Sequence, residues 1–188
     1  MTRLSYAVSF QGGTVNIYEA DYGIGPLMDV EDTINKGIEK LFERNRQEPG
    51  FDGLWMNEYG EVLYGSLLVA AQAYFIGSLR DINEIRKSLG LGTLTKQAAY
   101  KVHNITAQNY SLIELVNSAA NYFKHRDEWG DDWPENYTTK VLEAFSVTGE
   151  FPINDVQQLI EADYGYTKIT NLVSEWRKQL IAIAKNES

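Results

Sequence analysis

The chain has 188 residues, of which 44% are hydrophobic and 23% charged, and this is ordinary for a globular protein with one sizeable core. It contains no cysteine, which excludes disulfides, thiolate metal sites and cysteine nucleophiles. The net charge of −9 argues against broad non-specific binding to nucleic acid, because phosphate contacts need clustered Lys and Arg. The charge leaves open a local basic patch, a partner with a basic surface, or a role in solubility alone.

The sequence contains no obvious targeting segment. Its first residues, MTRLSYAVSFQGG, lack the continuous apolar core and the cleavage site of a signal peptide. The longest apolar run, residues 67–76, is interrupted by Gln72 and has about half the length that a membrane span needs. We therefore expect a cytoplasmic protein with no membrane association.

The N-terminal part, residues 1–25, is predicted to hold a small β-hairpin. Residues 3–19 alternate in polarity and are rich in β-branched and aromatic side chains, with Gln11, Gly12 and Gly13 at the turn. A lone hairpin is marginal in water, so this one must pack on the rest of the chain or pair with another copy.

From residue 26 onward the periodicity changes to that of helices. Asp29 is the expected N-cap of the first helix, and Pro134 the expected first residue of a later one. The other helices are expected over residues 58–89, 95–102, 155–162 and 167–184, with one more that begins at residue 111. The helix over 58–89 is apolar nearly all round at its middle, which is typical of the central element of a bundle. No low-complexity linker separates these elements, so residues 1–188 are predicted to form one mainly α domain, a helical bundle (26–188) with a small N-terminal β-hairpin (1–25).

Residues 111–134 carry an unusual set of polar side chains. At about 100° per residue, one side of the expected helix is polar and the opposite side is apolar. The polar stripe consists of Glu114, Ser118, Asn121, His125 and Glu128, and the apolar face of Leu112, Val116, Ala119 and Phe123. Solvated helix faces usually favour Lys and Glu, so a stripe of amide, hydroxyl and imidazole groups indicates a candidate site.

His125 is the first candidate within this stripe, since a neutral imidazole can act as a general base or metal ligand near pH 7. Asn121 lies four residues earlier, so the two side chains can meet on one helical face. The alternative is a surface histidine that packs on Trp129 or donates to a carboxylate. Glu114 also has a competing use, because Ser111 and Glu114 have the spacing of a capping box.

The acidic loop that follows could hold Mg²⁺ or Ca²⁺, which prefer oxygen ligands at short spacing. Its acids are Asp127, Glu128, Asp131 and Asp132. The loop lacks the twelve-residue calcium pattern, and its acids can equally be solvated or cap a helix, so we expect no metal site and no cofactor. Trp129 and Trp133 are expected to wedge the loop against the bundle. His103 is expected to be an unrelated surface residue.

The block Asn121-Tyr122-Phe123-Lys124-His125, late in a helical bundle, resembles the polar helix motif of the HEPN group. These are all-α domains of bacterial defence and toxin–antitoxin systems, and many of them are dimeric, metal-independent RNases. In that family an Arg precedes the His by several residues. Here the residues four to seven positions before His125 are Asn121, Ala120, Ala119 and Ser118, and Arg126 follows the histidine instead.

The resemblance implies a bacterial or phage stress or defence protein that either cleaves RNA or is a degenerate relative. In the first case His125 would take the 2′-hydroxyl proton and Asn121 would orient it. Lys124 or Arg126 would offset the phosphate charge, with Ser118 and Glu128 as further binding residues.

A second hypothesis is a non-catalytic acidic protein, such as an immunity protein or antitoxin, that binds a basic partner protein. Under either hypothesis we expect a homodimer. The hairpin has exposed edges, and the last helix is strongly amphipathic and carries Trp176.

Overall fold

The computed structural model describes residues 8–10, 13–103, 105–129 and 133–188. Within these residues the chain is mainly α, as predicted. The helices are α1 (Ile24–Gln47), α2 (Gly53–Ser88), α3 (Lys96–Tyr100), α4 (Leu112–His125), α5 (Tyr137–Ala144), α6 (Pro152–Ala162) and α7 (Ile169–Asn186), with short 3-10 helices η1 (Ile17–Glu19) and η2 (Arg126–Glu128). The strands are β1 (Val8–Phe10), β2 (Gly13–Val15), β3 (Ile105–Ala107) and β4 (Tyr110–Ser111).

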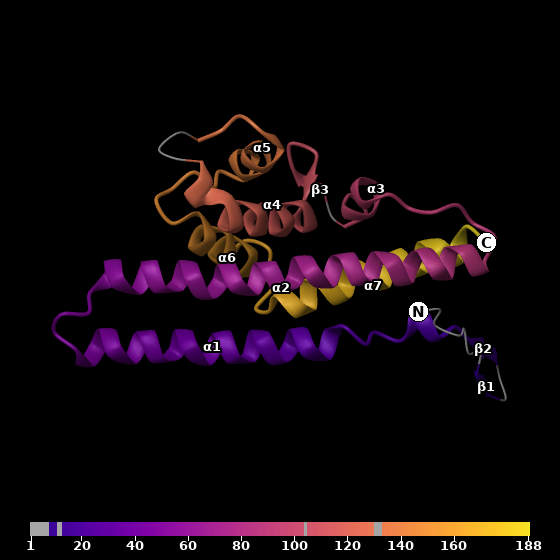
Figure 1. The fold of residues 1–188 in the computed structure, drawn as a ribbon, viewed down its shortest axis with the longest axis horizontal. Helices are drawn as coiled ribbons and strands as arrows, with labels where there is room; N and C mark the ends of the chain where they lie inside the picture. The colour runs from indigo at the N-terminus through magenta and orange to yellow at the C-terminus, as the bar shows by residue number, and fades with distance from the viewer. Residues whose placement is uncertain (1–7, 11–12, 104, 130–132) are drawn as a thin grey trace.

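The long helix α2 is the central element of the bundle (Figure 1). Helix α1 runs antiparallel beside it, and α7 lies along its C-terminal half. On the side away from α1, α2 contacts α4 and α6, and α5 packs on α4. The prediction of a central helix surrounded by the rest of the bundle is therefore confirmed.

The two long helices begin earlier than predicted, for reasons of local capping. The Asp52 carboxylate accepts from the backbone N–H of Leu54 at 3.0 Å, so α2 begins at Gly53 rather than at the predicted residue 58. Helix α1 begins at Ile24, whose N–H donates to the Asp21 carboxylate at 3.2 Å. Asp29, the predicted N-cap, lies inside α1, and that prediction is wrong.

Helix α5 also starts elsewhere than predicted. Asn136 is its N-cap and forms a capping box with Thr139, so the helix begins at Tyr137 rather than at Pro134. The Pro134 carbonyl accepts a hydrogen bond from the Thr139 hydroxyl at 2.6 Å. The capping box between Asn136 and Thr139 satisfies two backbone N–H groups. Proline at the first helical position has no N–H to satisfy, but it provides no hydrogen bond to the N–H groups that follow.

The β structure is small. Strands β1 and β2 pair antiparallel, with Val8 opposite Val15, inside the predicted hairpin. Residues 3–7 and 11–12 of that prediction lie outside the described residues. A second antiparallel pair, β3–β4, contradicts the expectation that strand is confined to the N-terminal part. Its turn residues, Gln108 and Asn109, have φ of 44° and 70°. The two strands are too short for the alternation of apolar and polar residues that would predict a strand from the sequence.

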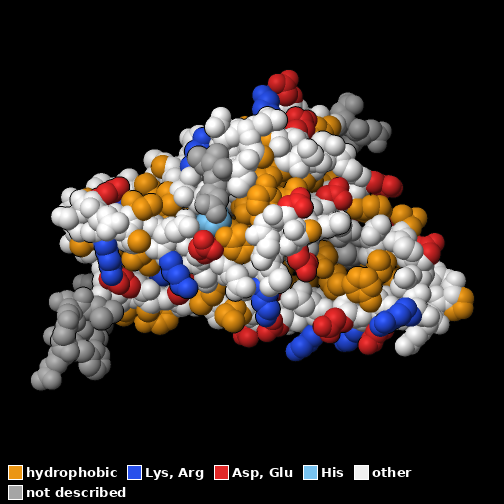
Figure 2. Space-filling view, turned by 180° about the vertical axis from the view of Figure 1, so that it is seen from behind, with side chains coloured by type: hydrophobic (Ala, Val, Ile, Leu, Met, Phe, Trp, Pro, Cys, Tyr) orange, Lys and Arg blue, Asp and Glu red, His pale blue; other side chains and the backbone are white. Residues whose placement is uncertain are grey.

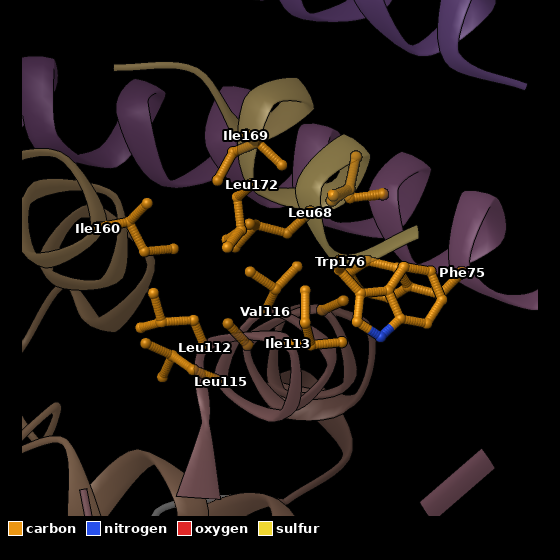
Figure 3. Close-up of a cluster of buried hydrophobic side chains, with 14 of the residues drawn as sticks. Leu68, Phe75, Leu112, Ile113, Leu115, Val116, Ile160, Ile169, Leu172 and Trp176 are labelled. Atoms are coloured by element: carbon orange, nitrogen blue, oxygen red, sulfur yellow. The ribbon is translucent and has the colours of Figure 1, made fainter. Parts of the chain in front are cut away.

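The core joins α2, α4, α6 and α7 (Figure 3). Trp176 of α7 is fully buried, donates its indole N–H to the Ala99 carbonyl at 2.8 Å, and packs edge-on to Phe75 at 5.1 Å between ring centroids. The apolar face of α7 is therefore used within the chain. This removes Trp176 as an argument for a homodimer, because the amphipathic pattern of α7 reports its own core contacts.

Candidate functional site

The predicted polar stripe of α4 does not face solvent. Every residue from 112 to 120 is buried, including Glu114 at 1% and Ser118 at 0% exposure. Helices α2, α5 and α6 all contact α4, so its first two and a half turns have no outer face. The prediction of an outward stripe is wrong for this part of the helix, and the polar groups there must find partners inside the protein.

Those partners are organised by one side chain of α2. Gln72 is 7% exposed, and its Nε2 donates to the Oδ1 atoms of Asn117 and Asn121, both at 2.9 Å. The Lys124 ammonium donates to Gln72 Oε1 at 2.7 Å. Because both asparagine oxygens are held by Gln72, both Nδ2 groups are turned away from it.

These two asparagines line a pocket of about 350 Å³ among α3, α4 and α5, which we call the α3–α4 pocket. A volume of this size is at the small end of ligand sites. Its lining residues are Lys96, Gln97, Tyr100, Glu114, Asn117, Asn121 and Tyr137. No residue in the described part of the chain accepts a hydrogen bond from either asparagine Nδ2.

Two side chains of α3, Lys96 and Tyr100, complete the lining on this side. Tyr100 is 3% exposed, and its hydroxyl has no hydrogen-bond partner among the described residues. The Lys96 ammonium lies 5.2 Å from the centre of the Tyr100 ring. Burial lowers the pKa of Lys96, and the neighbouring ammonium of Lys124 lowers it further. A negatively charged ligand beside Lys96 would offset the repulsion between the two ammonium groups.

The carboxylate of Glu114 is already committed. It accepts from the Ser111 backbone N–H at 2.8 Å and from the Tyr137 hydroxyl at 2.6 Å, which confirms the predicted capping box. Burial raises the pKa of Tyr137, and its hydrogen bond to Glu114 raises it further, so the hydroxyl stays protonated and donates. The described lining therefore faces the pocket mainly with donors and positive charge.

His125 lies outside this pocket, at the exposed end of α4. Its side chain is 47% exposed, and Nδ1 lies 3.1 Å from Glu128 Oε2. This contact is the carboxylate alternative given above. The predicted pairing with Asn121 is not formed, because the Asn121 oxygen is held by Gln72.

The other predicted binding residues do not converge on His125. Lys124 reaches into α2, and Arg126 Nη1 donates to Glu61 Oε2 at 3.3 Å. Ser118 is fully buried, with no described partner for its hydroxyl. Of these residues, only Glu128 lies beside His125. The side chains of Lys124 and Arg126 are long enough to reach polar partners on α2 instead.

The described part of the acidic loop forms no metal-binding cluster. Asp131 and Asp132 lie outside the described residues, and within the described ranges no three His, Asp or Glu side chains gather in a way that could hold an ion. Trp129 and Trp133 both pack on Tyr122, at 5.7 and 5.6 Å between ring centroids. These two tryptophans therefore wedge the loop against the bundle, as predicted.

His103 is not the surface residue that was expected. It is 0% exposed, and its Nε2 lies 3.2 Å from the Tyr166 hydroxyl and 3.9 Å from Glu175 Oε1. Burial lowers the pKa of His103, and the Glu175 carboxylate opposes this shift. The irregular segment around residue 103 folds back on the bundle, which its sequence did not indicate.

Among the residues of the α3–α4 pocket and its support that escaped the sequence reasoning are Gln72, Lys96, Tyr100 and Tyr137. The one available signal was Gln72, a polar residue interrupting an apolar run on a central helix, because such a residue needs a buried partner. The remaining three come from two other helices whose approach to α4 is a tertiary event.

Comparisons with protein-family models, with curated proteins and with solved structures find no match for this chain. The resemblance to the HEPN group therefore stays a prediction. Helix α2 is long and apolar enough to cross a membrane, a test that the core helix of a soluble protein also passes, and 44% of its most apolar window is buried. The cytoplasmic location stays a prediction as well.

Proposed function

We propose that this chain is a non-catalytic binding protein that captures an anionic group, a carboxylate or a phosphate, in the α3–α4 pocket. The observation that carries the proposal is the double hydrogen bond of Gln72. By holding the oxygens of Asn117 and Asn121, it aims two amide donors at the pocket beside Lys96. An anion there would accept charge-assisted hydrogen bonds from donors that need no rearrangement.

The electrostatics of the pocket support an anion rather than a cation. Burial lowers the pKa of Lys96, the neighbouring Lys124 ammonium lowers it further, and a bound negative charge would oppose both effects. The one carboxylate in the lining, Glu114, is occupied by a backbone N–H and by Tyr137.

Of the two hypotheses from the sequence, this proposal keeps the non-catalytic one and changes its target. The face seen in Figure 2 carries acidic side chains interspersed with basic and apolar ones, rather than one continuous acidic field. That pattern favours recognition at a pocket over recognition of a basic partner by overall charge. RNA cleavage through His125 remains a prediction. If it occurs, the chain would be a catalytic rather than a degenerate relative of the HEPN group.

The binding test uses inorganic phosphate and succinate as separate probes. Binding is measured by calorimetry and by the NMR shifts of the side-chain amides of Asn117 and Asn121. We expect one probe to bind, and Lys96→Met to weaken that binding about tenfold, which corresponds to about 1.4 kcal/mol. Lys101→Met is the matched control, because Lys101 is exposed next to α3 and does not line the pocket. Equal loss in both variants, or no binding of either probe, would overturn the proposal.

The catalytic alternative has its own assay, with a fluorescent single-stranded RNA and metal-free buffer. We expect no cleavage by the wild-type chain. Cleavage that disappears in a folded His125→Ala variant would establish the RNase hypothesis instead, since the exposed His125 side chain contributes little to the core.

A further inference from the structure

Helix α2 presents an apolar stripe that stays largely exposed, although Val69 packs against the core and Tyr59 contacts Phe51. Its residues follow each other at alternating steps of four and three, which is the spacing of a seam between two helices. We call this the α2 stripe; it consists of Trp55, Tyr59, Val62, Ser66, Val69, Ala73 and Ile76. Trp55 is 49% exposed, Val62 49% and Ile76 61%, whereas the other sides of α2 are buried against α1, α4, α6 and α7.

Gly77, next to the end of the stripe, points to a second helix. Glycine inside a helix is destabilising relative to alanine, so its presence needs a reason. Gly60 and Gly65 of the same helix have one within the chain, because a Cβ there would meet Asn154 or Phe123. A Cβ at Gly77 would meet no atom within 4 Å. Nothing within the described part of the chain therefore requires a glycine at position 77. Close approach of a helix from another molecule would require one.

The two ends of the α2 stripe differ in shape. Ala73 and Gly77 line a hollow of about 590 Å³ between α2 and residues 21–23. At the opposite end, the bulky side chains of Trp55 and Tyr59 stand half exposed, with their rings 6.3 Å apart. One helix face thus carries both a pair of large aromatic groups and a hollow lined by small residues.

These features are symmetric about Ser66. Tyr59 lies seven residues before Ser66 and Ala73 seven after it, while Trp55 lies eleven before and Gly77 eleven after. Two copies of α2 crossing antiparallel at Ser66 would set each large residue opposite a small one. Self-matching of this kind is what a two-fold interface requires, because the same patch serves both partners.

Charge follows the same symmetry. Asp52 lies fourteen residues before Ser66, and Arg80 lies fourteen after it. Asp52 is exposed, and the Arg80 side chain is 67% exposed. In the antiparallel arrangement the acid of each copy meets the base of the other at the rim, which fixes the register and disfavours a parallel pairing.

We propose that the α2 stripe binds a second copy of this chain, forming an antiparallel two-fold dimer in which Trp55 and Tyr59 of each copy fill the Ala73–Gly77 hollow of the other. The α2 stripe is apart from the α3–α4 pocket, so this inference does not depend on the proposed function. It also places the homodimer expected from the sequence on α2, rather than on the hairpin or on α7.

The first test measures the mass in solution of the full chain by light scattering at micromolar concentration. The wild type should give twice the 21.3 kDa chain mass. Gly77→Leu should give a folded monomer by circular dichroism, because the added side chain fits the open space of one copy but fills the hollow. Gly92→Leu is the matched control, since Gly92 is equally open and lies in the loop after α2. A monomeric wild type, or a dimer that persists in Gly77→Leu, overturns the proposal.

The register is tested by cross-linking. The chain has no cysteine, so Ser66→Cys introduces a single thiol at the crossing point. Mild oxidation should join two copies through this position, and should fail for the control Asn171→Cys, which is exposed on α7. If the protein is a monomer and a change in Trp55 fluorescence shows that it binds phosphatidylcholine vesicles, the stripe is a lipid-binding surface and the dimer proposal is overturned.

Discussion

The ring of Phe123 on α4 lies directly over the backbone of Gly65 on α2, with no room between them for a Cβ atom. This contact sets how closely the two helices approach. Two turns further along α2, Gln72 bridges to Asn117 and Asn121 at hydrogen-bond distance. The geometry of the α3–α4 pocket therefore depends on a glycine outside it.

Gly65→Ala should destabilise the protein even though alanine favours helix. The added methyl overlaps Phe123, and overpacking of this kind typically costs about 1–3 kcal/mol. Denaturant unfolding measures the change. The control is the double variant Gly65→Ala with Phe123→Leu, in which the methyl should cost less than it does alone. Additive effects of the two substitutions would show that the ring does not limit the approach.

Gln72→Met should leave the shape of α2 intact but strip the polar network of its centre. The Oδ1 atoms of Asn117 and Asn121 then lose their buried donor, and we expect a loss of about 1–3 kcal/mol in the free energy of unfolding. Anion binding should weaken too, because the two amides are no longer held. Gln158→Met, exposed on α6 and outside the pocket lining, is the control. A fully stable variant would indicate that water replaces the glutamine.

Glu31→Gln should loosen the start of α7. The buried Glu31 carboxylate accepts from the Ile169 N–H at 2.5 Å and from the Thr170 hydroxyl, while the N-cap residue Lys168 makes no side-chain cap. The Glu31 carboxylate thus caps the N-terminus of α7 from more than a hundred residues away in the sequence. Its negative charge also interacts favourably with the positive end of the helix dipole. We expect a cost of about 1–2 kcal/mol, with faster amide exchange confined to the first turn of α7. Glu39→Gln, exposed on α1, should leave both unchanged.

His103 should make the stability depend on pH. Burial lowers its pKa below the ordinary value of 6.5, so below pH 6.5 the unfolded chain takes up a proton that the folded protein refuses. The free energy of unfolding should therefore rise with pH between the lowered pKa and 6.5. His103→Gln should flatten this rise, and His125→Gln, at an exposed position, should not. Glu61, whose pKa is raised by burial, adds an opposite slope at lower pH in all three proteins.

Local interactions account for what the sequence predicted correctly. Ser111 and Glu114 form the capping box because their spacing alone decides it, and α2 is central because it is apolar nearly all round. The predicted starts of α1 and α5 were wrong where two capping residues competed within a few positions. Asp21 and Asn136 prevailed because each captures a free backbone N–H in the folded chain.

The candidate site could be read only in part. The sequence placed Asn121 and Glu114 on one stripe, but the packing of neighbouring helices makes these two residues part of a pocket wall rather than of an outer surface. Helical periodicity gives the angle of a side chain about its own axis and says nothing of which elements pack on each side. For that reason His125 looked equivalent to Asn121 and proved to be at the open end of the helix.

By itself the sequence determined the helical class, the order of the helices and the capping box of α4, because these depend on contacts within a few residues along the chain. The tertiary structure alone decided that Gln72 would hold two asparagines of α4, that Lys96 and Tyr100 would join them, and that one face of α2 would stay largely exposed. Each of these depends on the packing of helices far apart in sequence, where side-chain volume and the need to pair buried polar groups choose among faces that periodicity leaves equal.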